Sequence, residues 1–272
     1  METIISSKRR QRASNTPDPS FASTLARGLE VLAAFRPGDE GLGNAELASR
    51  TGLTRPTVSR LCNTLVQLGY VRRGRTGRYR LSAQVLRLAY PVLAQLRIRR
   101  LAHPLMREFA EAVRGTVSIG TFDGLGLVYV ETVRTTDAAD FVPDIGMHLP
   151  LVQSAMGRAL VSMLPDADAQ ALLERIRLTS PTLWGKYQQS AQQSIEACRT
   201  QGFCICTDGM RKEVHAVGAP IMLSPQGDQL AINCGIPVYL LRPMQLEQEI
   251  GPRLAALAAS IRALATTSER TD

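Results

Sequence analysis

The segment that most constrains this chain is TRPTVSRLCNTLVQLGY at positions 54–70. Its apolar residues follow a three-four-three spacing, which forms one stripe along a helix and fits no strand: Val58, Leu61, Leu65 and Leu68. We predict that Thr54 caps this helix and that a proline lies in its first turn, where the missing N–H costs little. The opposite face is polar and carries Pro56, Ser59, Arg60, Asn63 and Gln67.

A shorter helix is predicted directly upstream. Asn44 is placed to cap a helix over 44–50, and Gly52 supplies the left-handed residue that ends it. A short helix, a tight turn and a longer helix form a helix-turn-helix, whose second helix enters the major groove of DNA. An earlier helix over 24–35 completes a three-helix core. Its apolar residues are Leu25, Leu29 and Leu32.

The segment VRRGRTGRYRL at 71–81 has the pattern of a β-hairpin, because Gly74 and Gly77 permit a turn between two short strands. After a helix-turn-helix, such a hairpin forms the wing of a winged helix and lies against phosphates. Taken alone, the hairpin could equally be a solvated basic surface. The expected groove contacts on the helix are Arg55, Thr57, Ser59, Arg60 and Asn63. The expected phosphate contacts on the wing are Arg72, Arg73, Arg75 and Arg78.

The distribution of charge agrees with a DNA-binding N-terminal part. Residues 1–82 hold 14 Lys and Arg against 6 Asp and Glu, a net charge of +8. Residues 83–272 hold 18 of each kind and are therefore neutral. All of the formal net charge of +8 lies in the first third of the chain, which indicates a nucleic-acid module joined to a neutral domain.

The first twenty residues lack apolar periodicity and are predicted to be a flexible basic tail. No apolar region follows their charges as in a signal peptide, and no run approaches about 18 apolar residues. We therefore expect a cytoplasmic protein. The five cysteines have no regular spacing and are expected to be reduced thiols.

The next segment, 83–113, has the pattern of a helical connector with kinks or breaks at Pro91 and Pro104. Its apolar face could pair with a second subunit. Beyond Gly115 the period changes to that of strands, first as a hairpin, then after three helices as further strands, and a final helix is predicted over 244–265. This order indicates an α+β domain with an antiparallel sheet and packed helices.

From about Leu25 to Ala265 the chain resembles the IclR family of bacterial transcriptional regulators. The resemblance lies in LARGLEVLAAF, ELASRTGLTRPTVSRLCNTLVQLGYV, a wing ending in YRLS, VSIGTFDG, HLPLVQSAMGRALVSMLP, VGAPI and AINCGIP. It implies a winged helix-turn-helix, a linker helix and a C-terminal effector-binding domain with a GAF-like or profilin-like sheet. It also implies dimers or dimers of dimers on near-palindromic operators, and small organic or aromatic acids as effectors.

Together, the sequence patterns and the resemblance predict a disordered basic tail (1–20), a winged helix-turn-helix domain (21–82), linker helices (83–113) and an effector-binding and oligomerisation domain (114–272). The resemblance also implies which residues line the effector pocket. By their positions in the chain, these are Phe141, Leu149, Ala155, Met156, Cys206, Ala216, Asn233 and Gly235. This chain departs from many members at several of these positions, including Cys206 and Ala216, so a different ligand is expected.

Two further residues are candidates for holding an anionic effector. Ser154 lies at a predicted helix start, where free N–H groups favour a carboxylate, and His215 could add positive charge. Each also has a plainer interpretation, because Ser154 could only cap its helix and His215 could lie on the surface.

Two other site types remain open. Cys204, Cys206, Asp208 and His215 are residue types that bind zinc, although C-x-C-x-D is not a strong zinc pattern. A cysteine-dependent enzyme would use Cys206 with His215, but no oxyanion-hole motif or phosphate loop accompanies them. We therefore expect a regulator rather than an enzyme, with no cofactor, whose partners are double-stranded DNA, a small effector and further copies of itself.

Overall fold

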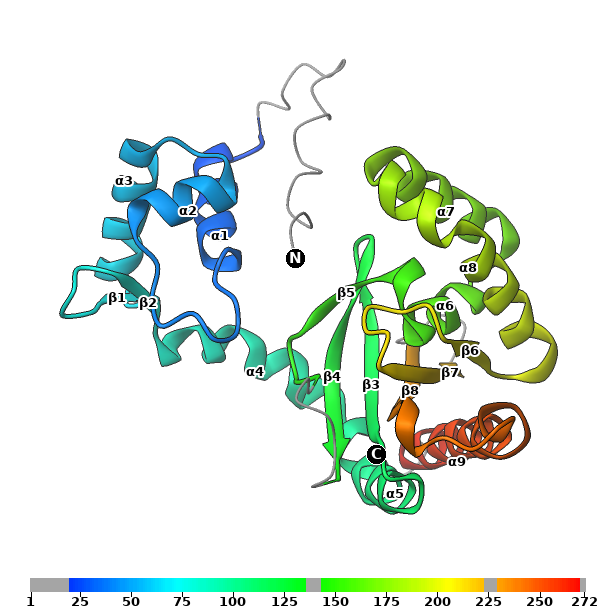
Figure 1. Ribbon diagram of the computed structural model, residues 1–272. Helices are drawn as coiled ribbons and strands as arrows, with labels where there is room; N and C mark the ends of the chain where they lie inside the picture. The colour runs from blue at the N-terminus through cyan, green and yellow to red at the C-terminus, as the bar shows by residue number, and fades with distance from the viewer. Residues whose placement is uncertain (1–19, 136–142, 223–228, 270–272) are drawn as a thin grey trace. The chain divides into compact units, whose positions relative to one another are not determined.

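The computed structural model describes residues 20–135, 143–222 and 229–269 (Figure 1). The chain divides into two units, Met1–Gln95 and Leu96–Asp272, so the division falls inside the predicted linker. Almost all of the predicted basic tail lies outside the described residues. None of the helices in the described ranges is long and apolar enough to cross a membrane.

The N-terminal unit is a winged helix-turn-helix. It contains α1 (Ser23–Ala33), α2 (Asn44–Thr51), α3 (Arg55–Gln67), β1 (Val71–Arg73) and β2 (Tyr79–Leu81) (Figure 1). Leu42 exchanges backbone hydrogen bonds of 2.8 Å with Tyr79 and so extends the hairpin by one bridge. The core of this unit consists of Val31, Ala34, Leu42, Leu47, Val58, Leu61, Cys62, Leu65, Val71 and Tyr79.

Three predicted core residues of this unit are exposed. Leu25 and Leu29 are 65% and 54% exposed, because α1 buries the neighbouring face that carries Val31. Leu68 is 57% exposed, because it caps the C-terminus of α3, and the buried Cys62 completes the apolar side instead.

Two predicted helix caps are wrong in detail. Helix α2 begins at Asn44 with Gly43 as its cap, and the Gly43 N–H donates to the Glu46 carboxylate at 2.8 Å. The Thr54 side chain makes no capping bond, because its hydroxyl hydrogen-bonds the Thr57 hydroxyl at 2.9 Å. The predicted left-handed end of α2 is confirmed, since Gly52 has a φ of 71°.

The connector forms η2 (Ala83–Val85), α4 (Leu86–Gln95) and α5 (Ile98–Val113). The break therefore lies at positions 96–97, and Pro91 and Pro104, where a kink or a break was predicted, both lie inside helices. Helix α4 buries no residue, whereas Leu96 and Ile98 are buried, so burial in the C-terminal unit begins at this break.

The C-terminal unit is built on a six-stranded sheet in the order β5-β4-β3-β8-β7-β6, in which every neighbouring pair is antiparallel. Its strands are β3 (Thr116–Asp123), β4 (Gly126–Arg134), β5 (His148–Pro150), β6 (Cys204–Cys206), β7 (Val214–Met222) and β8 (Gln229–Pro237). The α+β class and the antiparallel sheet are confirmed. The short edge strand β5 was not predicted.

Helices cover both faces of this sheet (Figure 1). One face packs against α6, and this side includes η3 (Leu151–Gln153), α6 (Ala155–Ser162), α7 (Asp166–Thr179) and α8 (Pro181–Gln201). The other face packs against α5 and α9 (Gly251–Glu269); η4 (Val238–Leu240) and the π-helical η5 (Leu246–Ile250) precede α9. Gly120 and Gly218 permit the close approach of α6, because a Cβ atom at either would collide with Met156 or Ala155.

Candidate functional sites

Helix α3 exposes most of the residues predicted to contact bases. Its apolar side is buried in the three-helix core, which fixes the direction of the other side. Arg55, Arg60 and Asn63 are exposed, and Thr57 and Ser59 are half-buried. The arrangement presents two guanidinium groups, hydroxyls and an amide, the groups that pair with base edges.

The register of the wing places Arg72 and Arg80 on a different face of the hairpin from Arg73. Arg72 lies opposite Arg80, and Arg73 lies opposite Tyr79. Since Tyr79 is buried, strand alternation directs Arg72 and Arg80 to the outer face of the hairpin. Two like charges directly opposite each other are unfavourable unless an anion lies beside them. The outer face of the wing is therefore suited to phosphate.

Two of the predicted phosphate contacts also hold the wing in place. Arg73 donates to Tyr79 Oη at 2.9 Å and to Asn63 Oδ1 at 3.2 Å, and its guanidinium lies 5.3 Å from the Tyr79 ring centre. Arg78 donates to the Gly41 carbonyl at 2.9 Å and forms an ion pair with Glu46 at 2.8 Å. These contacts fasten the hairpin to α3 and α2.

A pocket of about 760 Å³, counted to its open mouth, lies between the sheet and the N-terminal end of α6. It is lined by Thr116, Tyr129, Pro143, Leu149, Gln153, Ser154, Ala155, Cys206, Gly209, Met210, Arg211, Val214, Ala216, Asn233, Gly235 and Pro237.

The structure brings most of the predicted effector residues to this pocket, namely Leu149, Ser154, Ala155, Cys206, Ala216, Asn233 and Gly235. Met156 and His215 do not line it. Met156 is buried against Gly120, and strand alternation turns His215 to the face opposite Ala216. Phe141 lies outside the described residues.

The polar groups of the pocket are mostly neutral. Ser154 caps α6, with its hydroxyl oxygen accepting from Gly157 N–H at 3.0 Å, so the helix N-terminus opens onto the pocket. Burial raises the pKa of Tyr129 to about 12, although the neighbouring Asn233 amide acts to lower it. Tyr129 is therefore a neutral phenol near pH 7. The buried oxygens Gln153 Oε1 and Asn233 Oδ1 have no hydrogen-bond partner.

A buried arginine, Arg158, holds the loop that forms one edge of the pocket. Arg158, 1% exposed, donates to Val152 O, Ser194, Ser190 and Asp208 at 2.9–3.2 Å. Burial acts to raise the pKa of Asp208, but hydrogen bonds from Ser190 and Arg158 outweigh it and the net pKa is lowered. Asp208 therefore stays ionised and anchors the loop that carries the pocket residues Gly209 and Met210.

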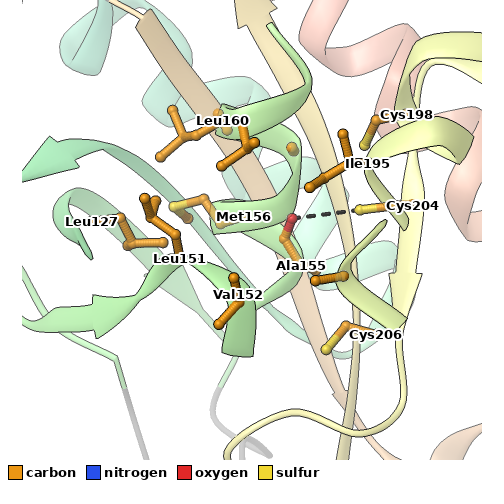
Figure 2. Close-up of a cluster of buried hydrophobic side chains, with 14 of the residues drawn as sticks. Leu127, Leu151, Val152, Ala155, Met156, Leu160, Ile195, Cys198, Cys204 and Cys206 are labelled. Atoms are coloured by element: carbon orange, nitrogen blue, oxygen red, sulfur yellow. Dashed lines mark hydrogen bonds between the residues drawn. The ribbon is translucent and has the colours of Figure 1, made fainter. Parts of the chain in front are cut away.

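Two cysteine thiols lie beside the start of α6 (Figure 2). Cys204 donates to the Ala155 carbonyl at 3.5 Å, and Cys206 donates to Asp208 at 3.4 Å. Burial raises the pKa of Cys206 to about 12, which opposes formation of a nucleophilic thiolate. His215 lies on the other sheet face from Cys206, so the structure does not assemble the predicted pair. Among the residues described, no three His, Cys, Asp or Glu side chains gather to hold a metal ion.

Known proteins resemble both units. The family described as "IclR helix-turn-helix domain" matches residues 24–75, and the one described as "Bacterial transcriptional regulator IclR C-terminal" matches residues 90–263. This chain belongs to the IclR family. The "HTH-type transcriptional regulator TsaQ1/TsaQ2" of Comamonas testosteroni is 30% identical to it over 88% of this chain and 87% of the relative.

Solved structures of IclR proteins share the fold. An IclR family transcriptional regulator from Brucella abortus is 35% identical, with a TM-score of 0.81 over 97% of this chain and 99% of that one. An IclR homologue complexed with 4-hydroxybenzoate, from Microbacterium hydrocarbonoxydans, is 19% identical, with a TM-score of 0.70 over 90% and 99%. The chain is an IclR-family transcriptional regulator with a helix-turn-helix DNA-binding domain and a C-terminal effector-binding domain.

Sequence reasoning missed several residues of these IclR sites. Arg80 was not among the predicted phosphate contacts. Because it alternates with Tyr79 on the second strand of the wing, the sequence could have predicted that it faces outward. Tyr129 and Arg158 carry no local motif, because their roles depend on which strand and helix lie beside them. The sequence therefore could not have revealed them.

Proposed function

We propose that this regulator binds a near-palindromic operator through paired winged helices and that a small acid in the C-terminal pocket changes its affinity. One observation carries the proposal: the same chain has an exposed helix α3 with basic side chains and, in its other unit, a partly polar pocket. The groove contacts are Arg55, Thr57, Ser59, Arg60 and Asn63. The phosphate contacts are Arg72, Arg75 and Arg80, with Arg73 and Arg78 both positioning the wing and adding charge.

The effector is an organic or aromatic acid in this proposal. The start of α6 directs backbone N–H groups and the positive end of the helix dipole to the pocket, which favours a carboxylate there. A second observation supports a ligand in the same pocket, because Asn233 is more than nine-tenths buried and leaves its amide oxygen unpaired. The aromatic acid bound to the Microbacterium homologue is consistent with this class.

A bulge in β4 offers a path from the pocket to the linker. Tyr129 pairs with Gly120, whereas Glu131 pairs with Ile119, so the extra residue Val130 turns Tyr129 and Glu131 to opposite faces of the sheet. Glu131 there forms an ion pair with Arg99 of α5 at 3.0 Å, and its other oxygen lies 3.4 Å from His103. A ligand that shifts Tyr129 would thereby move α5 and, through it, the DNA-binding units.

Self-association completes the proposal. In α4 the side chains Leu86, Leu88, Tyr90 and Val92 are 54–71% exposed, and Leu25 and Leu29 of α1 are exposed as well. Large apolar side chains grouped on helices of a small DNA-binding unit favour a partner surface. We assign them to pairing between copies, as a dimer or a dimer of dimers, on the two halves of the operator. We place this assembly in the cytoplasm and assign it no catalysis.

The test uses an operator selected from a random duplex library with the full-length protein. Arg60→Ala should weaken specific binding about tenfold to a hundredfold, as expected for loss of one bidentate base contact. Arg175→Ala, an exposed arginine of α7, is the matched control. An acid that binds the pocket should raise the melting temperature and change operator affinity. Unchanged operator affinity in Arg60→Ala removes this residue from the groove contacts.

A further inference from the structure

The amide group of Asn63 on helix α3 is oriented by an arginine of the wing. Arg73 Nη2 donates to Asn63 Oδ1 at 3.2 Å, and both residues are exposed. A guanidinium group has donors and no acceptor, so the amide atom that faces it is the oxygen. The wing is thereby joined to one of the side chains that we propose as groove contacts.

Arg73 is itself held by the wing. The same nitrogen, Nη2, donates to Tyr79 Oη at 2.9 Å, and the guanidinium carbon lies over the Tyr79 ring at 5.3 Å from its centre. Tyr79 is buried, and the strand register places it directly opposite Arg73. A planar guanidinium with a hydrogen bond and a stacking contact to one fixed ring is held in one orientation. The hairpin therefore fixes the group that occupies Asn63 Oδ1.

Occupation of this oxygen limits what Asn63 can recognise in the major groove. An asparagine with both amide atoms free pairs with adenine, because it accepts from N6 and donates to N7. Here only Nδ2 is left for a base, and no group in the described part of the chain accepts a hydrogen bond from it. A single donor favours guanine, with its O6 and N7 acceptors, and thymine, with its O4 acceptor. It disfavours the amino groups of adenine and cytosine.

We propose that Arg73 is a positioning residue that makes Asn63 select guanine or thymine, on one strand, at one base pair of each half-site. The inference rests on the proposed groove contact of Asn63 and states which bases that contact reads. Arg73 itself touches no base, and its Nε and Nη1 atoms are left for phosphate. The wing then affects sequence preference as well as affinity, although its own contacts to DNA carry no sequence information.

The experiment uses the full-length protein and an operator selected from a random duplex library. Each base pair of one half-site is replaced in turn by the other three, and the affinity of each duplex is measured by fluorescence anisotropy. The base pair that Asn63 reads is the one whose preference is lost in Asn63→Ala. At this pair, guanine and thymine on one strand should bind about threefold to tenfold more tightly than adenine and cytosine, as for one hydrogen bond.

Arg73→Met should change the preferred base. Without the arginine, Oδ1 can accept from a base, so adenine on the same strand should become the preferred base. A residue that only stabilised the wing would instead lower the affinity of all four duplexes together. Arg72→Met is the matched control, because it removes an equal charge from the other face of the hairpin. It should lower all four affinities alike and keep the preference for guanine and thymine.

Asn63→Asp tests the same contact without removing the arginine. It keeps an acceptor for Arg73 but loses the donor, so its second oxygen should favour the amino group of cytosine or adenine. The inference is wrong if Arg73→Met and Asn63→Asp both keep the preference for guanine and thymine. It is also wrong if the original protein already prefers adenine there, or if Asn63→Ala keeps every preference. In these cases the proposed operator binding stands. If the library yields no enriched sequence, operator binding fails, and the inference fails with it.

Discussion

The two units of this regulator hold their functional side chains in opposite ways. In the N-terminal unit, Arg60 and Arg72 stand on the outside of an apolar core that they do not help to form. In the C-terminal unit, residues such as Ala155 and Cys206 belong to the pocket and to the hydrophobic core at once. Substitutions on the first surface should therefore change binding and spare stability, whereas substitutions around the pocket should change both.

The largest effect is expected where the pocket and the core coincide. At Gly157, in the first turn of α6, an added Cβ atom would collide with the backbone of Leu151 in the preceding turn. Because backbone atoms cannot move aside as a side chain can, Gly157→Ala should destabilise the C-terminal unit by about 3 kcal/mol or more. Denaturant unfolding followed in the C-terminal unit measures this change.

The matched control for this substitution is Gly185→Ala in α8. No atom lies within 4 Å of the added Cβ there, so the change should stabilise the helix by up to about 1 kcal/mol. If Gly157→Ala is as stable as the control, the start of α6 can relax to accept the added atom. Substitutions around the pocket would then not necessarily change the stability of the C-terminal unit.

The second effect concerns communication between the two units. Glu131→Gln removes the charge that Arg99 faces and should weaken this contact by about 2 kcal/mol, as for hydrogen bonds to charged groups. Acid binding to the pocket should persist, while the acid-induced change in operator affinity falls severalfold. Titrations of acid and of operator, each with and without the other ligand, measure both quantities.

Glu111→Gln is the control, because Glu111 is an exposed residue of the same helix α5. A Glu131→Gln protein that keeps its full response to acid would show that the signal leaves the pocket by another route than β4 and α5.

The same contrast explains what the sequence could predict. Helix α3 and the wing are local structures, and their patterns are complete within about thirty residues, so the winged helix was predicted correctly. Its errors were local as well. Thr54 was expected to cap α3 but its hydroxyl bonds Thr57, and Leu68 was expected in the core but ends the helix. Both alternatives are short-range choices that spacing alone does not decide.

The pocket could be predicted only through resemblance, because it depends on strand register. His215 and Ala216 are neighbours in sequence, yet pairing of Ala216 with Cys206 and Gly235 directs Ala216 to the pocket and His215 away from it. The bulge at Val130 likewise separates Tyr129 from Glu131, which simple alternation would place on one face. Long-range contacts of this kind leave no mark on hydrophobic periodicity.

A third effect tests whether the N-terminal scaffold is independent of its DNA-binding surface. Asp39 accepts from both terminal nitrogens of Arg50, at 2.6 and 2.9 Å, and from Arg36 N–H at 2.7 Å. The Arg50 hydrogen bonds hold the pKa of Asp39 below its ordinary 3.8. Asp39→Asn should lower the free energy of unfolding by about 1–2 kcal/mol at pH 7 and leave the contacts to bases unchanged.

The pH dependence gives this prediction its sign. A carboxyl group with a lowered pKa stabilises the folded state above its ordinary pKa, and that contribution is lost as the pH falls through the lower value of the folded state. The stability difference between the original protein and Asp39→Asn should thus be full at pH 6–7 and shrink below about pH 4. Chemical unfolding of both proteins at a series of pH values checks it, and a constant difference would contradict the role assigned to the ionised carboxylate.

The smallest effect separates two kinds of arginine within the wing itself. Arg72 lies on the outer face opposite Arg80, whereas Arg78 is bonded to Gly41 and Glu46. Arg72→Ala should reduce the slope of log affinity against log salt by about 0.9, the value for one phosphate contact, and leave the melting temperature unchanged. Arg78→Ala should lower the melting temperature of the N-terminal unit and change the slope less, because Glu46 already balances part of its charge. Equal slopes for the two variants would mean that Arg78 leaves Glu46 and contacts phosphate when the protein binds DNA. The N-terminal unit would then rearrange on binding.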